Sequence, residues 1–359
     1  MEPGDNFESE IDEFLGQALR SGNALSLKKL MEGYRLSARS EGLSLNTIAI
    51  VESSVRYLEE FLSSQGASTD VGEIGTRELR QFAAYLRERP RFAHHRFTMP
   101  QAGQLSGHTI NGYMRALRAF WSWLEREDFI RENPFSRVKI PKAPKKVIPT
   151  FTEEQLRQIF GAIDVTSPAG FRDYTIILTL LDTGIRCSEL TALKLADVNL
   201  DSRLLKVWGK GSQERMVPIG AKVQNATWKY INRYRPEPAV PRYDQVFLTL
   251  AGHPLTKDRL ESIVERYGRK AGITGVRVSP HTFRHTMAVT FLRNGGDVFT
   301  LQRILGHAQL ETLRGYVNLA QSDISRVHHR NSPADNLEFT VRKINRRNHS
   351  KSPKLSRSA

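Results

Sequence analysis

The sequence predicts a mainly α-helical protein of two domains, with a small β-hairpin in the second, which is therefore of the α+β class. Apolar residues recur at spacings of three and four between Ser44 and Pro134, as they do on one face of a helix. A segment rich in proline and lysine then interrupts the pattern, which resumes near Phe151. Within the second region, residues 203–219 contain two β-prone runs around a glycine-rich turn, which is typical of a hairpin.

The first domain is expected to be a helical bundle over residues 41–135. Ser44 is a suitable N-cap for its first helix and Gly66 a suitable stop. Thr76 would begin a second helix, and a third follows a loop from Pro90 to Gly107. The apolar stripes of the three helices are Ile48, Val51, Val55, Leu58 and Leu62, then Leu79, Phe82, Ala83 and Leu86, then Ile110, Tyr113, Leu117, Phe120, Trp121 and Leu124.

The segments outside the two domains differ in charge. Residues 1–40 begin acidic and are expected to form an N-terminal extension. Residues 136–150 contain three prolines among four lysines and, because proline stiffens the chain and lacks a backbone donor, they are expected to form an extended basic linker. Residues 321–359 hold nine Lys/Arg against three Asp/Glu, and we expect a basic tail there.

The second domain is expected to span residues 151–320. Thr152 resembles a helix start with Gln155 in the capping-box position, and helical segments follow through Thr191. The runs LLKVW and ERMVPI flank the turn GKGSQ and predict the hairpin. Helical patterns return after it, from Leu255, across residues 281–295 and across residues 298–305.

The net charge points to an acidic partner. The chain carries 53 Lys and Arg against 38 Asp and Glu, a formal charge of +15. Such an excess attracts polyanions, of which nucleic acid is the commonest inside cells. A membrane surface is the competing partner, but no basic amphipathic helix with an apolar face is evident. A solvated basic surface without a ligand remains the alternative.

The location expected for the protein is the cytoplasm of a prokaryotic type of cell, at its DNA. The sequence has no run of about 18 apolar residues that would span a membrane. Its first residues are acidic, whereas a signal peptide begins basic. The single cysteine, Cys187, excludes an internal disulfide and suits a reducing compartment.

Basic residues of the first domain and the linker are candidate DNA contacts. Arg115 and Arg118 project from the third helix away from its apolar face, where contact with phosphates and plain solvation are equally compatible with the spacing. The four linker lysines could follow a DNA backbone between the domains; they are Lys139, Lys142, Lys145 and Lys146.

Chemistry-bearing residues occur in four segments of the second domain. Arg186 follows a glycine at an expected helix start, where a guanidinium can bind a phosphate through two hydrogen bonds. Lys210 lies between two glycines in the hairpin turn. After Pro280, which suits a first helical turn, His281 and Arg284 fall at i and i+3 on one face, suited to an anionic oxygen that must be held and protonated.

The remaining candidates are more ambiguous. His285 stands four residues after His281 and is equally compatible with a packed core histidine. A metal site is the rival interpretation of these histidines, but H-E-x-x-H and a cysteine pair are absent and the arginines would repel a cation. His307 precedes Tyr316 by nine residues, and a tyrosine in a helical stripe is more often part of the core than a nucleophile.

The order of these segments resembles that of the tyrosine recombinase (phage integrase and Xer) family. The segments TGIRCSEL, GKGSQERMVPI, HTFRH and LGH are together highly specific, and TINGYMRALRAFWSWL and ENPFSRVKIPK look like the family's DNA-clamping domain and linker. The resemblance extends from Ser44 to Leu319. The sequence departs from the pattern in LRGYVNL, which lacks the frequent threonine pair before Tyr316 and has Asn318 where histidine is frequent.

The resemblance implies a two-domain, C-shaped clamp on double-stranded DNA that exchanges strands between two sites as a homotetramer. It implies that Tyr316 attacks the phosphodiester and forms a 3′-phosphotyrosine, and that Arg186 and Arg284 hold the phosphate. Lys210, His281 and His307 would complete the catalytic set, with Glu189 in a structural position. No metal or cofactor is implied.

Two rival functions fit the same scaffold. A type IB topoisomerase-like enzyme would use the same chemistry without exchanging strands. A non-catalytic DNA-binding protein would not need the full set of catalytic residue types, which this sequence retains. The extra residues at both ends favour a recombinase of a mobile element over a housekeeping resolvase.

Overall fold

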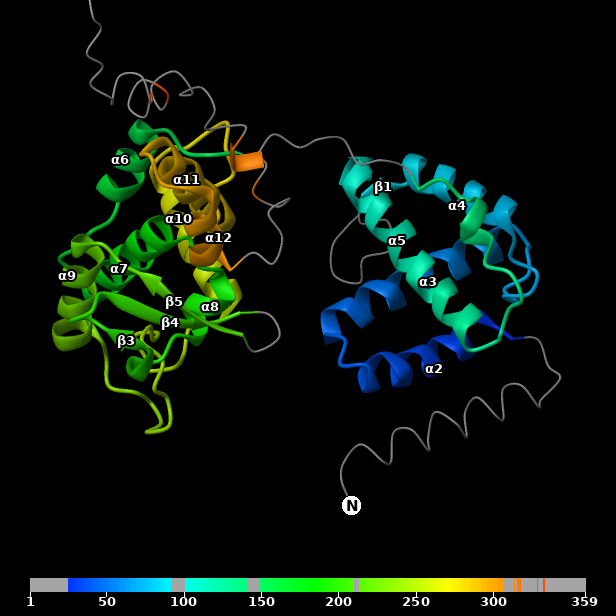
Figure 1. Ribbon diagram of the computed structural model, residues 1–359, viewed down its shortest axis with the longest axis horizontal. Helices are drawn as coiled ribbons and strands as arrows, with labels where there is room; N and C mark the ends of the chain where they lie inside the picture. Colours follow the sequence, from blue (N-terminus) through cyan, green and yellow to red (C-terminus); the bar gives the residue numbers. More distant parts are fainter. Residues whose placement is uncertain are drawn as a thin grey trace, which may run out of the picture. The chain divides into compact units, whose positions relative to one another are not determined.

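The computed structural model divides into two compact units, residues 1–146 and 147–359, each with its own hydrophobic core (Figure 1). It describes residues 25–91, 101–140, 149–209, 213–306, 313, 315–317, 328 and 332. Within this described part of the chain, no helix combines the length and apolarity needed to cross a membrane. The fold is mainly helical with a small sheet in the second unit, as the sequence predicted.

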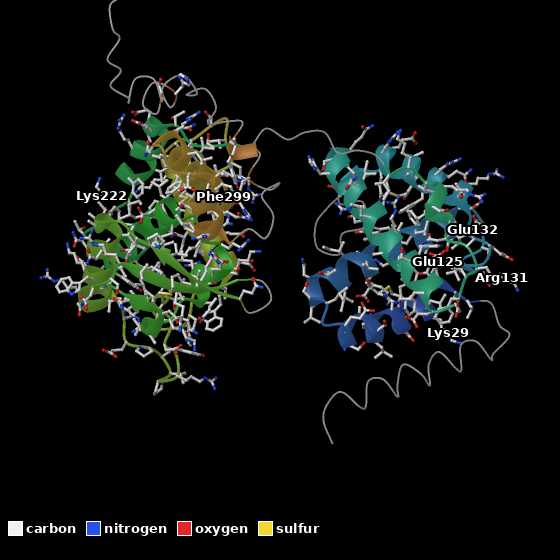
Figure 2. All side chains as sticks on the ribbon, viewed as in Figure 1. Lys29, Glu125, Arg131, Glu132, Lys222 and Phe299 are labelled. Carbon is white, nitrogen blue, oxygen red and sulfur yellow. The ribbon has the colours of Figure 1, made fainter. Side chains whose placement is uncertain are left out.

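The first unit is a helical bundle. It contains α2 (Leu27–Ser40), α3 (Leu45–Ser64), α4 (Thr76–Glu88) and α5 (Gly107–Arg126), followed by the 3-10 turn η1 (Pro134–Arg137). The predicted cap at Ser44 is confirmed, since its side chain accepts a hydrogen bond from the Thr47 amide. Glu125, near the end of α5 (Figure 2), accepts one from the Asn133 amide and so connects α5 to the segment before η1.

Two features of this unit differ from the expectation. Helix α2 lies in the hydrophobic core, where Tyr34 packs edge-on against Phe120 and Trp123. Residues 27–40 therefore belong to the bundle, and the N-terminal extension expected over residues 1–40 is too long. The loop expected after α4 contains two short antiparallel strands, β1 (Pro90–Arg91) and β2 (Gln101–Gln104).

The second unit contains the helices that the sequence predicted. They are α6 (Glu153–Gly161), α7 (Pro168–Thr183), α8 (Cys187–Ala192), α10 (Lys257–Lys270), α11 (Pro280–Arg293) and α12 (Val298–Leu305). The capping box of Thr152 and Gln155 is present at the start of α6. Helix α9 (Ala221–Lys229), the π-helical turn η4 (Tyr230–Tyr234) and the 3-10 turn η2 (Leu195–Asp197) were not predicted.

The predicted hairpin consists of β4 (Leu204–Trp208) and β5 (Glu214–Pro218), and a short strand that was not predicted, β3 (Val198–Asn199), pairs with β4. One face of the hairpin is buried through Leu205, Val207 and Val217, and Arg215 shares that face because it pairs with Val207. Trp208 and Met216 lie on the other, exposed face. The alternation therefore turns Arg215 toward the interior of the unit.

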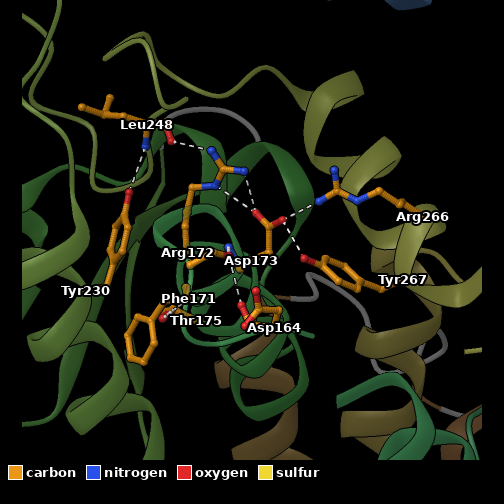
Figure 3. Close-up of polar contacts among 11 residues, drawn as sticks. Asp164, Phe171, Arg172, Asp173, Thr175, Tyr230, Leu248, Arg266 and Tyr267 are labelled. Carbon is orange, nitrogen blue, oxygen red and sulfur yellow. Dashed lines mark hydrogen bonds and ion pairs between the residues drawn. The ribbon is translucent and has the colours of Figure 1, made fainter. Parts of the chain in front are cut away.

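A buried ion network holds α7 in place (Figure 3). Asp173 of α7 is fully buried and accepts hydrogen bonds from Arg172, from Arg266 of α10 at 2.6 Å and from the Tyr267 hydroxyl at 3.1 Å. Arg172 also donates to the Leu248 carbonyl. A buried carboxylate is tolerated when it is paired in this way. The network fixes α7, whose C-terminal end reaches the candidate site.

Candidate active site

The candidate residues gather around the C-terminal end of α12, where α12 contacts β5 and α11, and α11 contacts α7. Helix α7 is capped at its C-terminal end by Gly184, which has a left-handed φ of 61°. A Cβ on Gly184 would come within 2.9 Å of the Leu305 side chain, so glycine allows the ends of α7 and α12 to meet. The short helix α8 begins three residues later, at Cys187, with Arg186 as its N-cap residue.

Glu189 organises the α8 side of the site. Its carboxylate accepts hydrogen bonds from the Arg186 amide at 2.7 Å and from the Arg186 Nη1 at 2.8 Å. The same carboxylate accepts a two-pronged pair from Arg215 Nη1 and Nη2, at 2.9 and 2.8 Å. Glu189 therefore holds Arg186 against the hairpin while the Arg186 side chain stays 35% exposed.

Charge pairing keeps Glu189 ionised. Burial alone would raise the pKa of its carboxyl, but the hydrogen bonds from Arg215 and from the Arg186 amide outweigh burial and lower the pKa from 4.5 to about 2. The carboxylate is therefore charged at any pH at which the protein would work. The negative charge of Glu189 allows Arg186 and Arg215 to lie next to each other, because both donate hydrogen bonds to it.

Replacing Glu189 by glutamine should destabilise the second unit by about 3 kcal/mol near neutral pH, because Arg215 would lose its charged partner in a buried setting. Since the folded-state pKa is depressed, the contribution of the carboxylate is complete above about pH 4.5 and is lost as the pH falls toward 2. Denaturant titrations of wild type and Glu189→Gln should therefore differ most near pH 7 and converge in acid.

The matched control for this substitution is Glu154→Gln, which removes an equally charged but exposed partner of Arg157. An exposed pair contributes roughly 0–1 kcal/mol, so the control should unfold almost as wild type does. Equal unfolding midpoints for Glu189→Gln and wild type would contradict the role assigned to the Glu189 carboxylate.

Two arginines secure the end of α12 through its backbone. Arg284 of α11, 4% exposed, donates to the Gly184 carbonyl at 2.6 Å and to the Leu305 carbonyl at 2.8 Å. Arg215 donates through Nε to the Ile304 carbonyl at 2.8 Å. The last carbonyls of a helix have no partner within the helix, and these guanidinium groups supply one. Burial and then the nearby charge of Arg186 lower the pKa of Arg284 to about 10, so it remains a cation near neutral pH.

Tyr316 lies in a helical turn at residues 315–317, and its side chain is 4% exposed. Its hydroxyl oxygen is 2.7 Å from Nδ1 of His285 on α11, and the two ring centroids are 5.5 Å apart. Burial raises the pKa of the phenol, and the charge of Arg284 only partly offsets this. Tyr316 is therefore a neutral phenol that must lose its proton before it can act as a strong nucleophile.

His281 occupies the first turn of α11, one turn before His285, and the two rings stack at 6.4 Å. Desolvation and then the charge of Arg284 lower the pKa of His281, so the imidazole is neutral near pH 7. Arg186 also acts on His281 electrostatically. The structure thus brings together Arg186, His281, Arg284 and Tyr316, which come from three separate segments of the sequence.

Two predicted site residues, Lys210 and His307, lie outside the described residues, but their neighbours border the site. A Cβ on Gly209, which precedes Lys210, would lie 3.6 Å from Arg215 Nη1 and 4.0 Å from Glu189 Oε1. A Cβ on Gly306, which precedes His307, would lie 3.0 Å from Arg215 Cδ. The chain therefore passes the site immediately before each of these residues.

The candidate DNA contacts are only partly within the described residues. Arg115 and Arg118 are exposed, as expected for residues off the apolar face, and the linker residue Lys139 is exposed as well. Arg118 also donates to the Val138 carbonyl at 3.2 Å, so part of its guanidinium supports the start of the linker. Lys142, Lys145 and Lys146 lie outside the described residues.

Two residues at the centre of the site were not assigned a role in it from the sequence. Arg215 had a signal: in the alternating run ERMVP it falls on the same face as Val217, and a charged residue on the buried face of a strand needs a partner. His285 was noted only as an ambiguous candidate, because its spacing from His281 is equally compatible with packing in the core. Among the described residues, no group of His, Cys, Asp and Glu side chains is arranged to hold a metal ion.

Comparison with known proteins covers both units. Residues 149–323 match the phage integrase family, and residues 26–140 match the phage integrase SAM-like domain. Tyrosine recombinase XerD of Staphylococcus haemolyticus is 30% identical over 288 residues, which cover 77% of this chain and 97% of that protein. Tyrosine recombinase XerC of Halalkalibacterium halodurans is 31% identical over 294 residues, covering 80% and 92%.

Solved structures share the fold. The XerH site-specific recombinase bound to a palindromic difH substrate matches with a TM-score of 0.64 at 20% identity, covering 93% of this chain and 97% of that one. The Tn1549 transposon integrase, in complex with a circular intermediate DNA, also has a TM-score of 0.64, at 22% identity, covering 84% and 99%. Because XerD is matched at 30% identity over nearly its whole length and integrase models cover both units, the chain belongs to the phage integrase family of tyrosine recombinases, enzymes that cleave and rejoin DNA.

Proposed function

We propose that this site-specific DNA recombinase cleaves each strand by attack of the Tyr316 hydroxyl on a phosphodiester, leaving a 3′-phosphotyrosine and a free 5′-hydroxyl. The observation that carries the proposal is the placement of a buried tyrosine hydroxyl 2.7 Å from an imidazole, on the helix that also bears Arg284. The 5′-hydroxyl of a partner strand then attacks the phosphotyrosine. Because the bond is kept in the covalent link, the exchange needs neither nucleotide nor metal.

Arg186 and Arg284 would bind the nonbridging oxygens of the phosphate as negative charge gathers on it. Both guanidinium groups lie at the same site, and the Arg186 side chain is 35% exposed. Preformed donors of this kind are effective because they need no rearrangement during the reaction, and loss of one typically costs about a hundred- to a thousandfold in rate. His281 and His307 would add further hydrogen bonds to the phosphate.

Lys210 would donate a proton to the departing 5′-oxygen. The hairpin supports this role, because Arg215 fastens β5 to Glu189 and Gly209 passes beside the same carboxylate. The hairpin that leads into Lys210 is thus anchored at the site through β5. An alkoxide is a poor leaving group, so its departure requires a proton donor.

Two domains joined by the basic linker would together clamp double-stranded DNA. They are the helical domain, which ends at residue 135, and the catalytic domain, residues 151–320. Arg115, Arg118 and Lys139 would contact phosphates, and so would Lys142, Lys145 and Lys146. Phosphate contacts make affinity fall steeply with salt concentration, in proportion to their number. We place this activity in the bacterial cytoplasm, in a homotetramer that holds two recombination sites.

A suicide substrate tests the chemistry directly. DNA nicked near the cleavage point loses the short fragment that carries the 5′-hydroxyl, so the covalent intermediate accumulates. Proteolysis and mass spectrometry of the adduct should place the nucleotide on Tyr316, attached through the 3′-phosphate. An adduct on any other residue, or on a 5′-phosphate, would contradict the proposal.

The basic tail is expected to act in assembly. Truncation after Leu319 should leave binding to one site unchanged while weakening cooperative binding to paired sites, because Ile324, Val327 and the basic residues that follow would dock on a neighbouring subunit. Gel-shift titrations on single and paired sites measure the two quantities. Unchanged cooperativity would remove the tail from assembly.

A further inference from the structure

We propose that His285 is a catalytic residue of this recombinase, which holds the Tyr316 hydroxyl through Nδ1 and takes its proton as the tyrosine attacks phosphorus. The inference rests on the proposed role of Tyr316 and names the group that activates it. The resemblance to the family placed His281 among the catalytic positions and left His285 without a role. The geometry distinguishes the two histidines.

The contact between His285 and Tyr316 has the geometry of proton transfer. The 2.7 Å separation of Nδ1 and the phenol oxygen lies within the roughly 2.6–3.2 Å expected between a general base and the group it deprotonates. The rings meet at 48° with centroids 5.5 Å apart, so the hydroxyl points to the edge of the imidazole. His285 is half-buried and Tyr316 almost fully buried, which limits competition from water.

The other imidazole of α11 is less well placed for this step. His281 lies one turn earlier, with its ring centroid 6.4 Å from that of His285, and its side chain is exposed. The charged groups that act on it are Arg284, Glu261, Lys257 and Arg186, which belong to α11, α10 and the start of α8. His281 is thus close to the two arginines proposed to bind the phosphate, whereas His285 contacts the hydroxyl of the proposed nucleophile.

The buried phenol needs such a base. Burial raises the pKa of Tyr316 above its ordinary value of 10, so the hydroxyl does not ionise by itself near neutral pH. The positive charge of Arg284, the residue before His285, favours the phenolate once the proton leaves. An ordinary imidazole has a pKa of about 6.5 and can accept a proton near neutral pH.

Cleavage is a single displacement at phosphorus. The Tyr316 oxygen forms a bond to phosphorus as its proton passes to Nδ1 of His285, which becomes an imidazolium. The bond from phosphorus to the 5′-oxygen breaks, and that oxygen takes a proton from Lys210. In rejoining, the incoming 5′-hydroxyl returns a proton to Lys210, and the imidazolium protonates the departing Tyr316 oxygen.

Two substitutions of His285 test the proposal. His285→Ala removes the ring, whereas His285→Asn keeps an amide near the position of Nδ1 that can accept a hydrogen bond but is not a base. Both should slow single-turnover cleavage of a suicide substrate by at least about a hundredfold, the usual contribution of a general base, with DNA affinity within about threefold of wild type. His253→Asn, at an exposed histidine beside Tyr243 in the same unit, is the matched control and should cleave normally.

A second measurement separates proton transfer from positioning. Replacing Tyr316 by a difluorotyrosine, whose hydroxyl ionises near neutral pH, removes the need for a base. The His285→Asn defect should then shrink at least tenfold at pH 8. A defect of unchanged size, or wild-type cleavage by either His285 variant with ordinary Tyr316, would overturn the proposal. These results are distinct from failure of the proposed function, in which Tyr316→Phe itself would still form the adduct.

Discussion

Tyr316→Phe should bind recombination-site DNA as tightly as wild type and form no covalent adduct with it. The ring of Tyr316 is part of the hydrophobic core of the second unit, and phenylalanine fills the same space. The substitution removes the hydroxyl that lies against His285 and with it the only nucleophilic oxygen proposed for the reaction. Denaturing gels of reactions with a suicide substrate should show a protein–DNA band for wild type and none for the variant.

The control for this experiment is Tyr234→Phe, because Tyr234 stacks on Phe171 at 4.4 Å and makes none of the contacts of the site described above. That variant should be trapped as wild type is. Trapping of Tyr316→Phe at the wild-type level would mean that a different group attacks the phosphate, and the reaction would have to be reassigned.

Lys210→Ala should cleave ordinary DNA at least about a hundredfold more slowly, because the 5′-alkoxide would leave without its proton donor. Replacing the bridging 5′-oxygen by sulfur gives a leaving group of much lower pKa that hardly needs the proton. The variant should therefore recover most of its rate on the sulfur-containing substrate. Single-turnover rates on the two substrates measure the effect.

Two comparisons make the Lys210 result specific. Arg186→Ala should remain slow on both substrates, since an arginine that holds the phosphate is needed whatever the leaving group. Lys206→Ala removes a lysine from the exposed face of the same hairpin and should change neither rate. Equal defects of Lys210→Ala on both substrates would show that Lys210 only binds phosphate and that His281 is the next candidate for the acid.

Much of the fold follows from local signals in the sequence. Ser44 and Thr152 begin helices because their side chains accept hydrogen bonds from amides three residues later, which depends only on neighbouring residues. The run from Leu204 to Pro218 forms a hairpin because its two strands are adjacent in the sequence. Pro280 begins α11 because its ring suits a first helical turn.

The remaining features depend on contacts between distant residues. Tyr34 belongs to the core because it meets Phe120 and Trp123, more than 80 residues away, which no pattern within residues 1–40 reveals. The contact of His285 with Tyr316 spans 31 residues and depends on how the end of α12 is held. Local spacing places both residues on helical turns but does not determine that they meet.

Arg215 and Arg284 hold the end of α12 through its backbone carbonyls, and this affects which sequence changes the helix can tolerate. Arg215 and Arg284 contact the carbonyl oxygens of Ile304 and Leu305, which every amino acid possesses, so other apolar residues at these positions would keep both contacts. Gly184 and Gly306 differ, because each combines a positive φ with a neighbour about 3 Å from a would-be Cβ. In homologous sequences, positions 304 and 305 should therefore vary among apolar residues, while positions 184 and 306 remain glycine.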